Sequence, residues 1–467
     1  MNEEMGTEMN STEMKEEKGN QISISFASVG INEERSQIIS NRIAGRLSKL
    51  SETSAERYIF RVPDKLRKGK EAYEPETLAI GPYHHTKTNL KQMEKHKLTY
   101  LQDLLARRAE SNVESYIRAL ILLEEKARKA YAEEIIYSKN DFVEMLLLDG
   151  CFIIEFFRKY RNPGLRNVDD PIFGMNLMLK VLRDLILFEN QIPFFILVRL
   201  FDMTTFSSEE IDLIGLITSS LTDLFPGYNP SRVTKVHADG VELIDHILGL
   251  MYETWSSSFL DLLTDPAKPL PLEFINCTTE LQRAGIKFEK SVGCDSWLDI
   301  KFKNGVIKIP PLVVGVVTES VFKNLIAYEE YKFDPRSNWK CVTDYVVFMD
   351  SLIKSSNDVK KLRHHQIIEN WLGGDERVCA MFENLGKNVF FHSTKFCYSR
   401  VFKDVNICTK QQWNVWIAQW NIWIANLRRT YFKTPWSVIS FMAAVALLLL
   451  TCIQTIFAIL QCNSVTH

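Results

Sequence analysis

The feature that most constrains this chain is an apolar stretch close to its C-terminus. From Trp436 to Leu460 the sequence reads WSVISFMAAVALLLLTCIQTIFAIL, without one Asp, Glu, Lys or Arg. As a helix, a stretch of this length measures about 37 Å, enough to cross a hydrocarbon core of about 30 Å with some tilt. A buried core helix this long would usually show a polar face. We therefore predict a transmembrane helix over 435–460.

The residues that flank this stretch predict its orientation. Arg428, Arg429 and Lys433 precede it, whereas the short tail at 461–467 contains no Lys or Arg. Positively charged flanks stay on the cytoplasmic side, so we expect a single-pass protein with its N-terminal domain in the cytosol. Without a signal peptide in the sequence, insertion is expected to be of the tail-anchored kind. The length of the span favours the plasma membrane over the endoplasmic reticulum.

Two glycosylation sequons keep the opposite orientation open. They begin at Asn10 and Asn276, and in the cytosol both would go unused. Their use would mean that the domain is displayed outside the cytosol.

A Trp-rich segment at 408–430 precedes the predicted span. Its large apolar residues recur at spacings of three and four, which places them on one face of a helix: Trp413, Trp416, Ile417, Trp420, Trp423, Ile424 and Leu427. We predict an amphipathic juxtamembrane helix. One interpretation is that it lies in the membrane interface, where Trp is enriched. The other is that the Trp face packs on the soluble domain.

The rest of the chain divides into an acidic tail and one large domain. Residues 1–25 begin with a segment rich in Glu and Met and free of aromatic residues, which predicts disorder. Between about 55 and 400 no linker or fixed-period repeat occurs, so we predict a single soluble domain. Lys and Arg total 56 against 58 Asp and Glu, a formal charge of −2. This balance argues against a nucleic-acid partner.

The first half of this domain carries helical patterns. Apolar stripes predict a helix over 91–109, and the apolar segment 141–160 predicts a central buried helix. Residues 175–201 read as two helices broken at 190–192, because Pro193 cannot continue the first helix but suits the first turn of the second.

The second half combines helices with a small sheet. Alternation between 284 and 317 predicts strands, and Asn304-Gly305 between two alternating runs predicts a hairpin. Residues 358–372 predict a further helix that ends at Gly373. The fold class is therefore α+β and predominantly α-helical, with a large helical domain, a small antiparallel β-hairpin or sheet, and the C-terminal transmembrane helix.

Motifs that carry chemistry are missing from the sequence. It contains no phosphate-binding loop, dinucleotide fingerprint, nucleophile elbow, zincin motif or Cys-x-x-Cys. The nine cysteines match no zinc spacing and read as reduced cytosolic thiols. The pairs His84-His85 and His364-His365 are the best metal candidates, but adjacent side chains point apart on a helix or a strand. We expect no metal and no cofactor.

Four carboxylates stand in apolar surroundings: Asp149, Glu155, Asp184 and Glu189. A buried carboxylate needs a partner or a raised pKa, and raised pKa values are typical of active sites. Local partners favour a structural role instead. Glu155 and Lys159 stand four residues apart, as do Asp184 and Lys180. Glu189 lies at the predicted helix break, where backbone groups or a nearby arginine can bind it. We assign no catalytic or cofactor-binding residue.

Eight short blocks in one order carry a family resemblance. They are IGPYHH at 80–85, MEKHK at 93–97, DGCFIIEFF at 149–157, DLILFENQIPFF at 184–195, ELQRAGIKF at 280–288, IPPL at 309–312, ESVFKNLIAYEE at 319–330 and TPWSVIS before the span. Together they resemble the plant protein family catalogued as domain of unknown function 247. The resemblance implies a land-plant source and a mostly helical domain tethered by a C-terminal helix, and brings no catalytic residue or cofactor with it.

The expected function is a non-enzymatic protein-interaction or recognition module tethered to the bilayer, with an unidentified protein partner. One alternative is an enzyme of unrecognised type that uses buried carboxylates or the His84-His85 region. The other is a recognition protein displayed at the cell surface, by analogy with grass members of the family implicated in self-incompatibility.

Overall fold

The computed structural model describes residues 27–51, 57–67, 70–108, 112–205, 211–224, 244–260, 263, 272–294, 296–332, 339–387, 389, 395–431 and 435–464. The predicted acidic tail at 1–25 lies outside these residues. The chain forms two compact units, Met1–Arg57 and Tyr58–His467. The described part of the first unit consists of Arg57 and the helix α1 (Ala27–Ser51), whose apolar residues Ile38, Ile43 and Leu47 are about half exposed.

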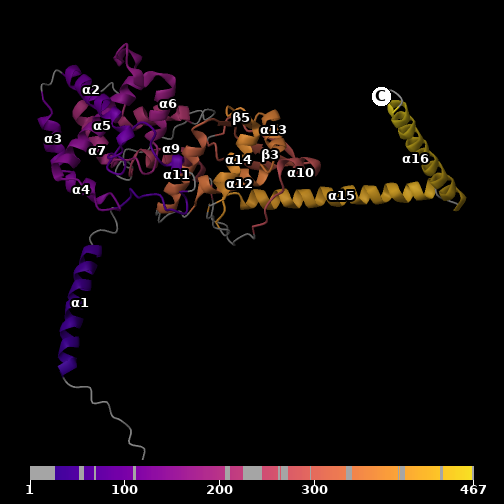
Figure 1. Cartoon of the computed structure of the whole chain (residues 1–467), viewed down its shortest axis with the longest axis horizontal. Helices are drawn as coiled ribbons and strands as arrows, with labels where there is room; N and C mark the ends of the chain where they lie inside the picture. The colour runs from indigo at the N-terminus through magenta and orange to yellow at the C-terminus, as the bar shows by residue number, and fades with distance from the viewer. Residues whose placement is uncertain are drawn as a thin grey trace, which may run out of the picture. The chain divides into compact units, whose positions relative to one another are not determined.

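The second unit is predominantly helical, as predicted. Its first group of helices is coloured indigo to magenta in Figure 1 and comprises α2 (Gln92–Arg107), α3 (Glu114–Ile121), α4 (Glu124–Lys129), α5 (Lys139–Arg161), α6 (Met175–Asp184), α7 (Phe194–Thr204), α8 (Leu213–Leu221) and α9 (Ile247–Leu260). Short 3-10 turns occupy Lys70–Ala72, Thr88–Leu90, Pro163–Leu165, Pro171–Phe173 and Thr222–Leu224.

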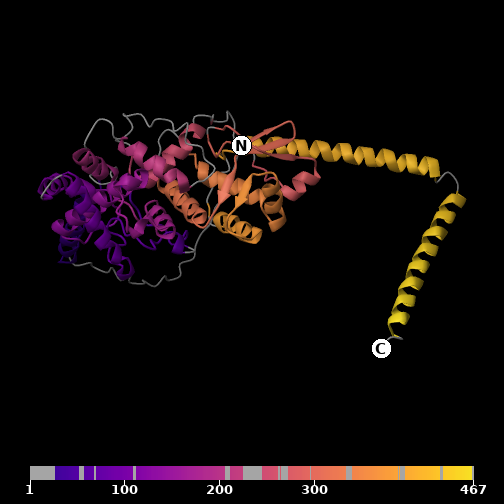
Figure 2. The ribbon, with the colours of Figure 1, turned by 90° about the horizontal axis from the view of Figure 1, so that it is seen from above.

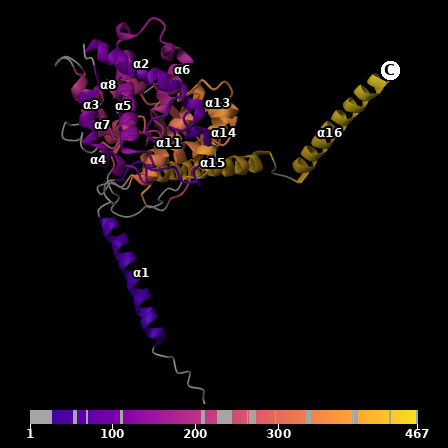
Figure 3. The ribbon, with the colours of Figure 1, turned by 60° about the vertical axis from the view of Figure 1, so that its left-hand side comes forward.

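The predicted central helix is α5. It contacts α2, α3, α7 and α8, and it buries residues on all of its faces between Phe142 and Lys159. Figures 1 and 3 both show α5 among α2, α3 and α7, and Figure 3 also labels α8 in this group. Ser138 caps its N-terminus by accepting a hydrogen bond from the Asp141 N–H.

The second group of elements is orange in Figure 2 and lies beside the first. Its helices are α10 (Thr278–Arg283), α11 (Thr318–Tyr331), α12 (Cys341–Leu352), α13 (Ser356–His364) and α14 (Asp375–Gly386). Its strands are β1 (Lys287–Lys290), β2 (Lys301–Lys303), β3 (Val306–Ile309), β4 (Leu312–Val314) and β5 (Ile368–Asn370).

The strands form two small sheets. The predicted hairpin is confirmed: β2 pairs antiparallel with β3, and the turn has positive φ at Asn304 (52°) and Gly305 (77°). The other pairings are parallel, β1 with β3 and β4 with β5. Alternation of residue types reports which faces are buried and carries no information on strand direction.

Two predicted helices end earlier than their sequence patterns indicated. The helix expected to reach residue 189 ends at Asp184, because that side chain turns inward to bind the backbone of another segment. The helix expected over 358–372 ends at His364, where Gln366 adopts a positive φ of 57°. The remainder forms β5, whose partner β4 lies more than fifty residues earlier in the chain.

The Trp-rich segment belongs to the long helix α15 (Ser399–Tyr431), whose start packs on the body through buried Phe402 and Val405. Further along, Trp420 is 48% exposed, Trp423 54% and Ile424 40%, so this part of the predicted Trp face is not packed on the body. The other side chains of that face lie outside the described ones.

The apolar C-terminal stretch forms α16 (Pro435–Ser464). By length and composition, Ile439–Phe457 can cross a membrane, and none of its most apolar part is buried. The helix extends four residues into the predicted tail at 461–467, and residues 465–467 lie outside the described part.

The turn at 304–305 makes a testable contribution to stability. Replacing Gly305 by Ala forces a side chain into a left-handed conformation and should lower the free energy of unfolding by about 1 kcal/mol. Urea unfolding followed by Trp fluorescence measures this. Gly315→Ala is the control, since φ is not positive there and an added Cβ meets nothing within 4 Å. Equal losses in both variants would contradict the turn assignment.

Candidate functional site

The connection between α6 and α7 buries three consecutive polar side chains, Glu189, Asn190 and Gln191. Each is at most 2% exposed. Pro193 ends this connection, because α7 begins at Phe194 with Pro193 at its N-cap position. Polar groups buried this deeply are costly unless hydrogen-bonded, so their partners reveal what the connection does.

The two amide side chains hold backbone. Asn190 accepts from the Ile80 N–H (2.7 Å) and donates to the carbonyls of Leu78 (2.9 Å) and Asp184 (2.8 Å). Gln191 donates to the carbonyls of Leu185 and Leu187, both at 2.8 Å. The first amide therefore joins the connection to the segment at 76–81, and the second closes the connection on itself.

Two of the predicted carboxylates hold the same segment 76–81. Asp184 accepts from the N–H groups of Thr77 (2.8 Å) and Leu78 (2.9 Å), and its other oxygen accepts from Glu76 (3.3 Å). Asp149 accepts from the Gly81 N–H at 2.8 Å. Burial raises the pKa of Asp184 to about 6, against the opposing effect of these backbone donors and a neighbouring arginine.

A buried lysine completes this arrangement. Lys97 is fully buried in α2 and donates to Asp149 (2.6 Å), to the Ala79 carbonyl (2.8 Å) and to Glu94 (2.6 Å). Burial raises the pKa of Asp149, although the charge of Lys97 opposes the shift. Gly81 has φ +70°, and a Cβ there would lie 2.4 Å from the Gln191 carbonyl oxygen, so the two segments meet at van der Waals distance.

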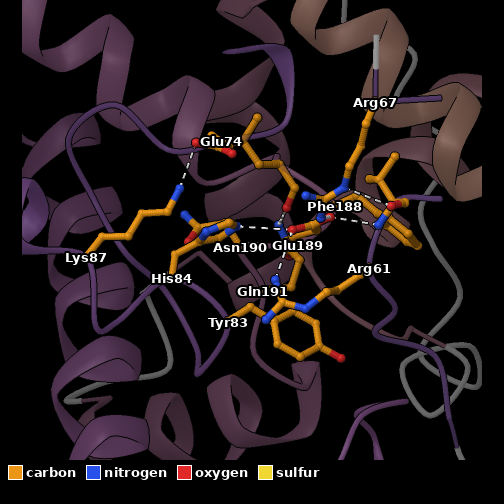
Figure 4. A network of polar contacts seen from close by, with 12 residues as sticks. Arg61, Arg67, Glu74, Tyr83, His84, Lys87, Phe188, Glu189, Asn190 and Gln191 are labelled. Atoms are coloured by element: carbon orange, nitrogen blue, oxygen red, sulfur yellow. Dashed lines mark hydrogen bonds and ion pairs between the residues drawn. The ribbon is translucent and has the colours of Figure 1, made fainter. Parts of the chain in front are cut away.

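Glu189 is the centre of a charged cluster, which we call the Glu189 cluster (Figure 4). One carboxylate oxygen accepts from the Val62 N–H at 2.7 Å and from the Arg67 guanidinium. The other lies 3.4 Å from His84 Nε2 and 3.6 Å from Arg61 Nη1. Burial alone would raise the pKa of Glu189, but His84, the Val62 N–H and Arg67 outweigh it and the pKa is lowered.

The edge of the Glu189 cluster reaches solvent. Arg61 has 37% of its side chain exposed, pairs with Glu133 at 2.8 Å and lies 4.4 Å above the Tyr83 ring. Lys87, 31% exposed, pairs with Glu74 at 2.8 Å. The cluster thus consists of an ionised, buried carboxylate surrounded by cations. A carboxylate stabilised in this way is a weak general base.

The local ion pairs expected from the sequence do not form. Glu155 pairs with Arg107 at 2.6 Å, and Lys159 instead donates to Asp103 at 2.6 Å. Asp184 binds Arg183 (2.9 Å) rather than a lysine four residues away. The i,i+4 rule applies to side chains on an exposed helix surface, whereas these carboxylates point into the interior. There Glu155 binds an arginine of another helix, and Asp184 binds the backbone of another segment together with the adjacent Arg183.

Glu189 was expected to bind backbone groups or Arg183. Its backbone partner is the Val62 N–H, and its guanidinium partners are Arg67 and Arg61. These arginines lie more than 120 residues earlier in the chain, and no local sequence pattern indicates them or the full burial of Lys97.

The two histidine pairs have separate surroundings. His84 is buried beside Glu189, while the ring of His85 contacts Tyr137 edge-on with centroids 6.0 Å apart. The rings of His364 and His365 meet edge-on with centroids 5.5 Å apart, and His365 Nε2 lies 2.9 Å from Gln282 Nε2. Among the described residues, no group of three or more His, Cys, Asp or Glu side chains is placed to hold a metal ion.

A family model described as a plant protein of unknown function, DUF247, matches residues 59–450. The chain belongs to this family. Among curated members, the UPF0481 protein At3g47200 of Arabidopsis thaliana is 31% identical over 430 residues, 86% of each chain. The putative UPF0481 protein At3g02645 of the same plant is 24% identical and covers 85% of this chain and 89% of its own. No solved structure matches the chain significantly. The resemblance carried by the eight blocks is therefore confirmed.

The Glu189 cluster predicts that removing the charge of Glu189 lowers the free energy of unfolding far more than removing the charge of Glu133. Glu189→Gln leaves Arg67 and Arg61 facing a neutral group and should lower the free energy of unfolding by about 3 kcal/mol. Glu133→Gln, which removes an exposed partner of the same Arg61, should change it by about 0.5 kcal/mol or less. Urea unfolding at pH 7 compares the two. An unchanged unfolding free energy for Glu189→Gln would contradict the architectural role.

The effect of Glu189→Gln on the free energy of unfolding should also depend on pH. The pKa of Glu189 is lowered from its ordinary value of 4.5 in the folded state, so its stabilising effect is present above that pH and disappears as the pH falls through the folded-state value. The difference in stability between the wild type and Glu189→Gln should therefore shrink below about pH 4.5.

Proposed function

We propose that this family member is a single-pass, membrane-tethered module that binds another protein and catalyses no reaction, with its folded body in the cytosol. The membrane tether is supported by one observation: the apolar side chains of α16 from Ile439 to Phe457 are not buried. An apolar helix of this length is stable when lipid surrounds it, since the exposed leucines would otherwise remain in water.

The occupancy of the interior carboxylates supports a non-catalytic role. Both oxygens of Asp184 accept backbone N–H groups, and both oxygens of Glu189 face cations. A general base must reach a substrate proton with a free lone pair. The oxygens of these carboxylates are occupied by contacts that hold segments of the chain in place, which is a structural role.

The exposed part of α15 supports the binding role. The rings of Trp420 and Trp423 contact each other in a tilted arrangement with centroids 5.3 Å apart, and both residues remain about half exposed. Interfacial helices usually carry Lys and Arg on their polar face, whereas Asn and Gln take those positions between 411 and 427. Tryptophan is the residue most enriched at the energetic centres of protein interfaces. We therefore place the partner surface on this helix.

Affinity capture tests this surface. A chain lacking Trp436–Leu460 should be soluble and as stable as the full chain, and should capture a specific protein. Replacing Trp420 and Trp423 together by Ala should weaken that capture about tenfold or more. Trp371→Ala is the matched control, because Trp371 is 63% exposed on the body. No protein above background, or equal capture by all three chains, would contradict the proposal.

Orientation is tested by protease protection on sealed membranes. One tag is placed before Gln21 and another after His467. We expect digestion of the N-terminal tag and no glycan at Asn276, which is exposed and so accessible to a transferase in the other compartment. A protected N-terminal tag with a glycan at Asn276 would overturn the cytosolic orientation and favour surface recognition of the self-incompatibility type. Fractionation of the same membranes tests whether the plasma membrane is the site.

A further inference from the structure

Two cysteines that are 56 positions apart in the sequence meet inside the second unit. Cys341 is the first residue of α12, and Cys397 lies two residues before α15. Their sulfur atoms are 3.7 Å apart. Cys341 is fully buried, whereas Cys397 is partly exposed. A disulfide holds its sulfur atoms about 2.05 Å apart, so an approach of about 1.7 Å would close this pair.

The surroundings hold both cysteines in place. The Cys397 N–H donates to an Asp344 carboxylate oxygen at 2.8 Å, one turn after Cys341 on the same helix. The next residue, Tyr398, is buried, donates to the Leu298 carbonyl at 2.8 Å and packs on Phe348 with ring centroids 5.1 Å apart. The segment that carries Cys397 is thus fixed against α12 by contacts that do not involve the thiols.

We propose that Cys341 and Cys397 are a modification site that closes to a disulfide when the chain meets a low-molecular-weight disulfide such as glutathione disulfide. The partly exposed Cys397 thiolate attacks the small disulfide, forming a mixed disulfide and releasing one thiolate, which takes up a proton. Cys341 then loses its proton to solvent or buffer and attacks the Cys397 sulfur, releasing the second small thiol. Two protein thiols are oxidised and one small disulfide is reduced to two thiols.

The environment makes this closure slow. Burial raises the pKa of both thiols, and the carboxyl groups of Glu329 and Asp344 add to the shift of Cys341, while Lys332 opposes it. Since the thiolate is the reacting form, little of it is present at neutral pH. The pair is therefore suited to slow thiol–disulfide exchange rather than to rapid redox turnover.

The cross-link would act at the base of α15. That helix leads from the body to α16, and Cys397 precedes its first turn. Joining Cys397 to α12 restricts the unfolded chain between the two cysteines and stabilises the folded state. It also fixes covalently the point from which the helix leaves the body.

The test uses the full chain in detergent micelles, incubated for hours at pH 8 with glutathione disulfide. Remaining thiols are alkylated, and peptides are mapped without reduction. We expect a linked peptide containing Cys341 and Cys397, and a rise of about 3 °C in the unfolding temperature. Cys397→Ala and Cys341→Ala should lose both effects. Cys294→Ala, which removes a thiol elsewhere, should keep both.

Two outcomes would overturn the proposal. In one, Cys341 and Cys397 remain alkylatable when the treated chain is unfolded. In the other, the linked peptides join these cysteines to other cysteines as often as to each other. Because the purified chain is used, either result is independent of the orientation in the membrane and of the partner-binding role proposed above.

Discussion

The structure of the first half of the body depends on the burial of Glu189, Asn190 and Gln191. An amide or carboxylate taken out of water must regain its hydrogen bonds. Asn190 and Glu189 find partners more than 100 residues earlier in the chain, whereas Gln191 binds carbonyls of the connection itself. The segment 76–81 has no regular secondary structure that would satisfy its own backbone. Each of the two segments therefore supplies what the other lacks, and neither is stable in this form alone.

Patterns that are local in sequence were sufficient to predict local structure. The apolar run of α5, the hairpin at 304–305 and the apolar C-terminal helix all follow from residue spacing or from the φ angles that a turn requires. The segment at 358–372 shows the limit. Its spacing suits a helix, but Ile368 pairs with Leu312 in a parallel strand, and a contact with a distant strand outweighs local preference.

The sequence was sufficient to predict that the buried carboxylates have polar partners, but not which residues those partners are. Sequence alone indicated that Glu155 and Asp184 needed partners, and both have them. Which partners they have depends on the packing of elements distant in sequence, so Arg107 and the N–H groups of 76–78 could not be inferred from spacing. Residues that act through such long-range contacts leave no signal in a single sequence beyond their unusual polarity within apolar runs.

Buried carboxylates in this body fall into two physical classes. Asp184 and Glu189 have partners at both oxygens, and their geometry is fixed by backbone. Asp344 accepts from one backbone N–H, while its other oxygen has no hydrogen-bond partner among the described residues, and burial raises its pKa to about 8. It is therefore mostly protonated at neutral pH, and a neutral carboxyl group costs less to bury than an ionised one.

The two kinds of carboxylate lie in different parts of the body. Asp184 and Glu189 position segments of the helical half, whereas Asp344 lies where α12 meets the start of α15. Since α15 leads to α16, any constraint that a membrane imposes on α16 reaches the body through α15. The start of this helix is held by the hydrogen bond of the Cys397 N–H to Asp344, by aromatic contacts of Phe402, and by contacts of Asn406 and Lys410 with Glu273.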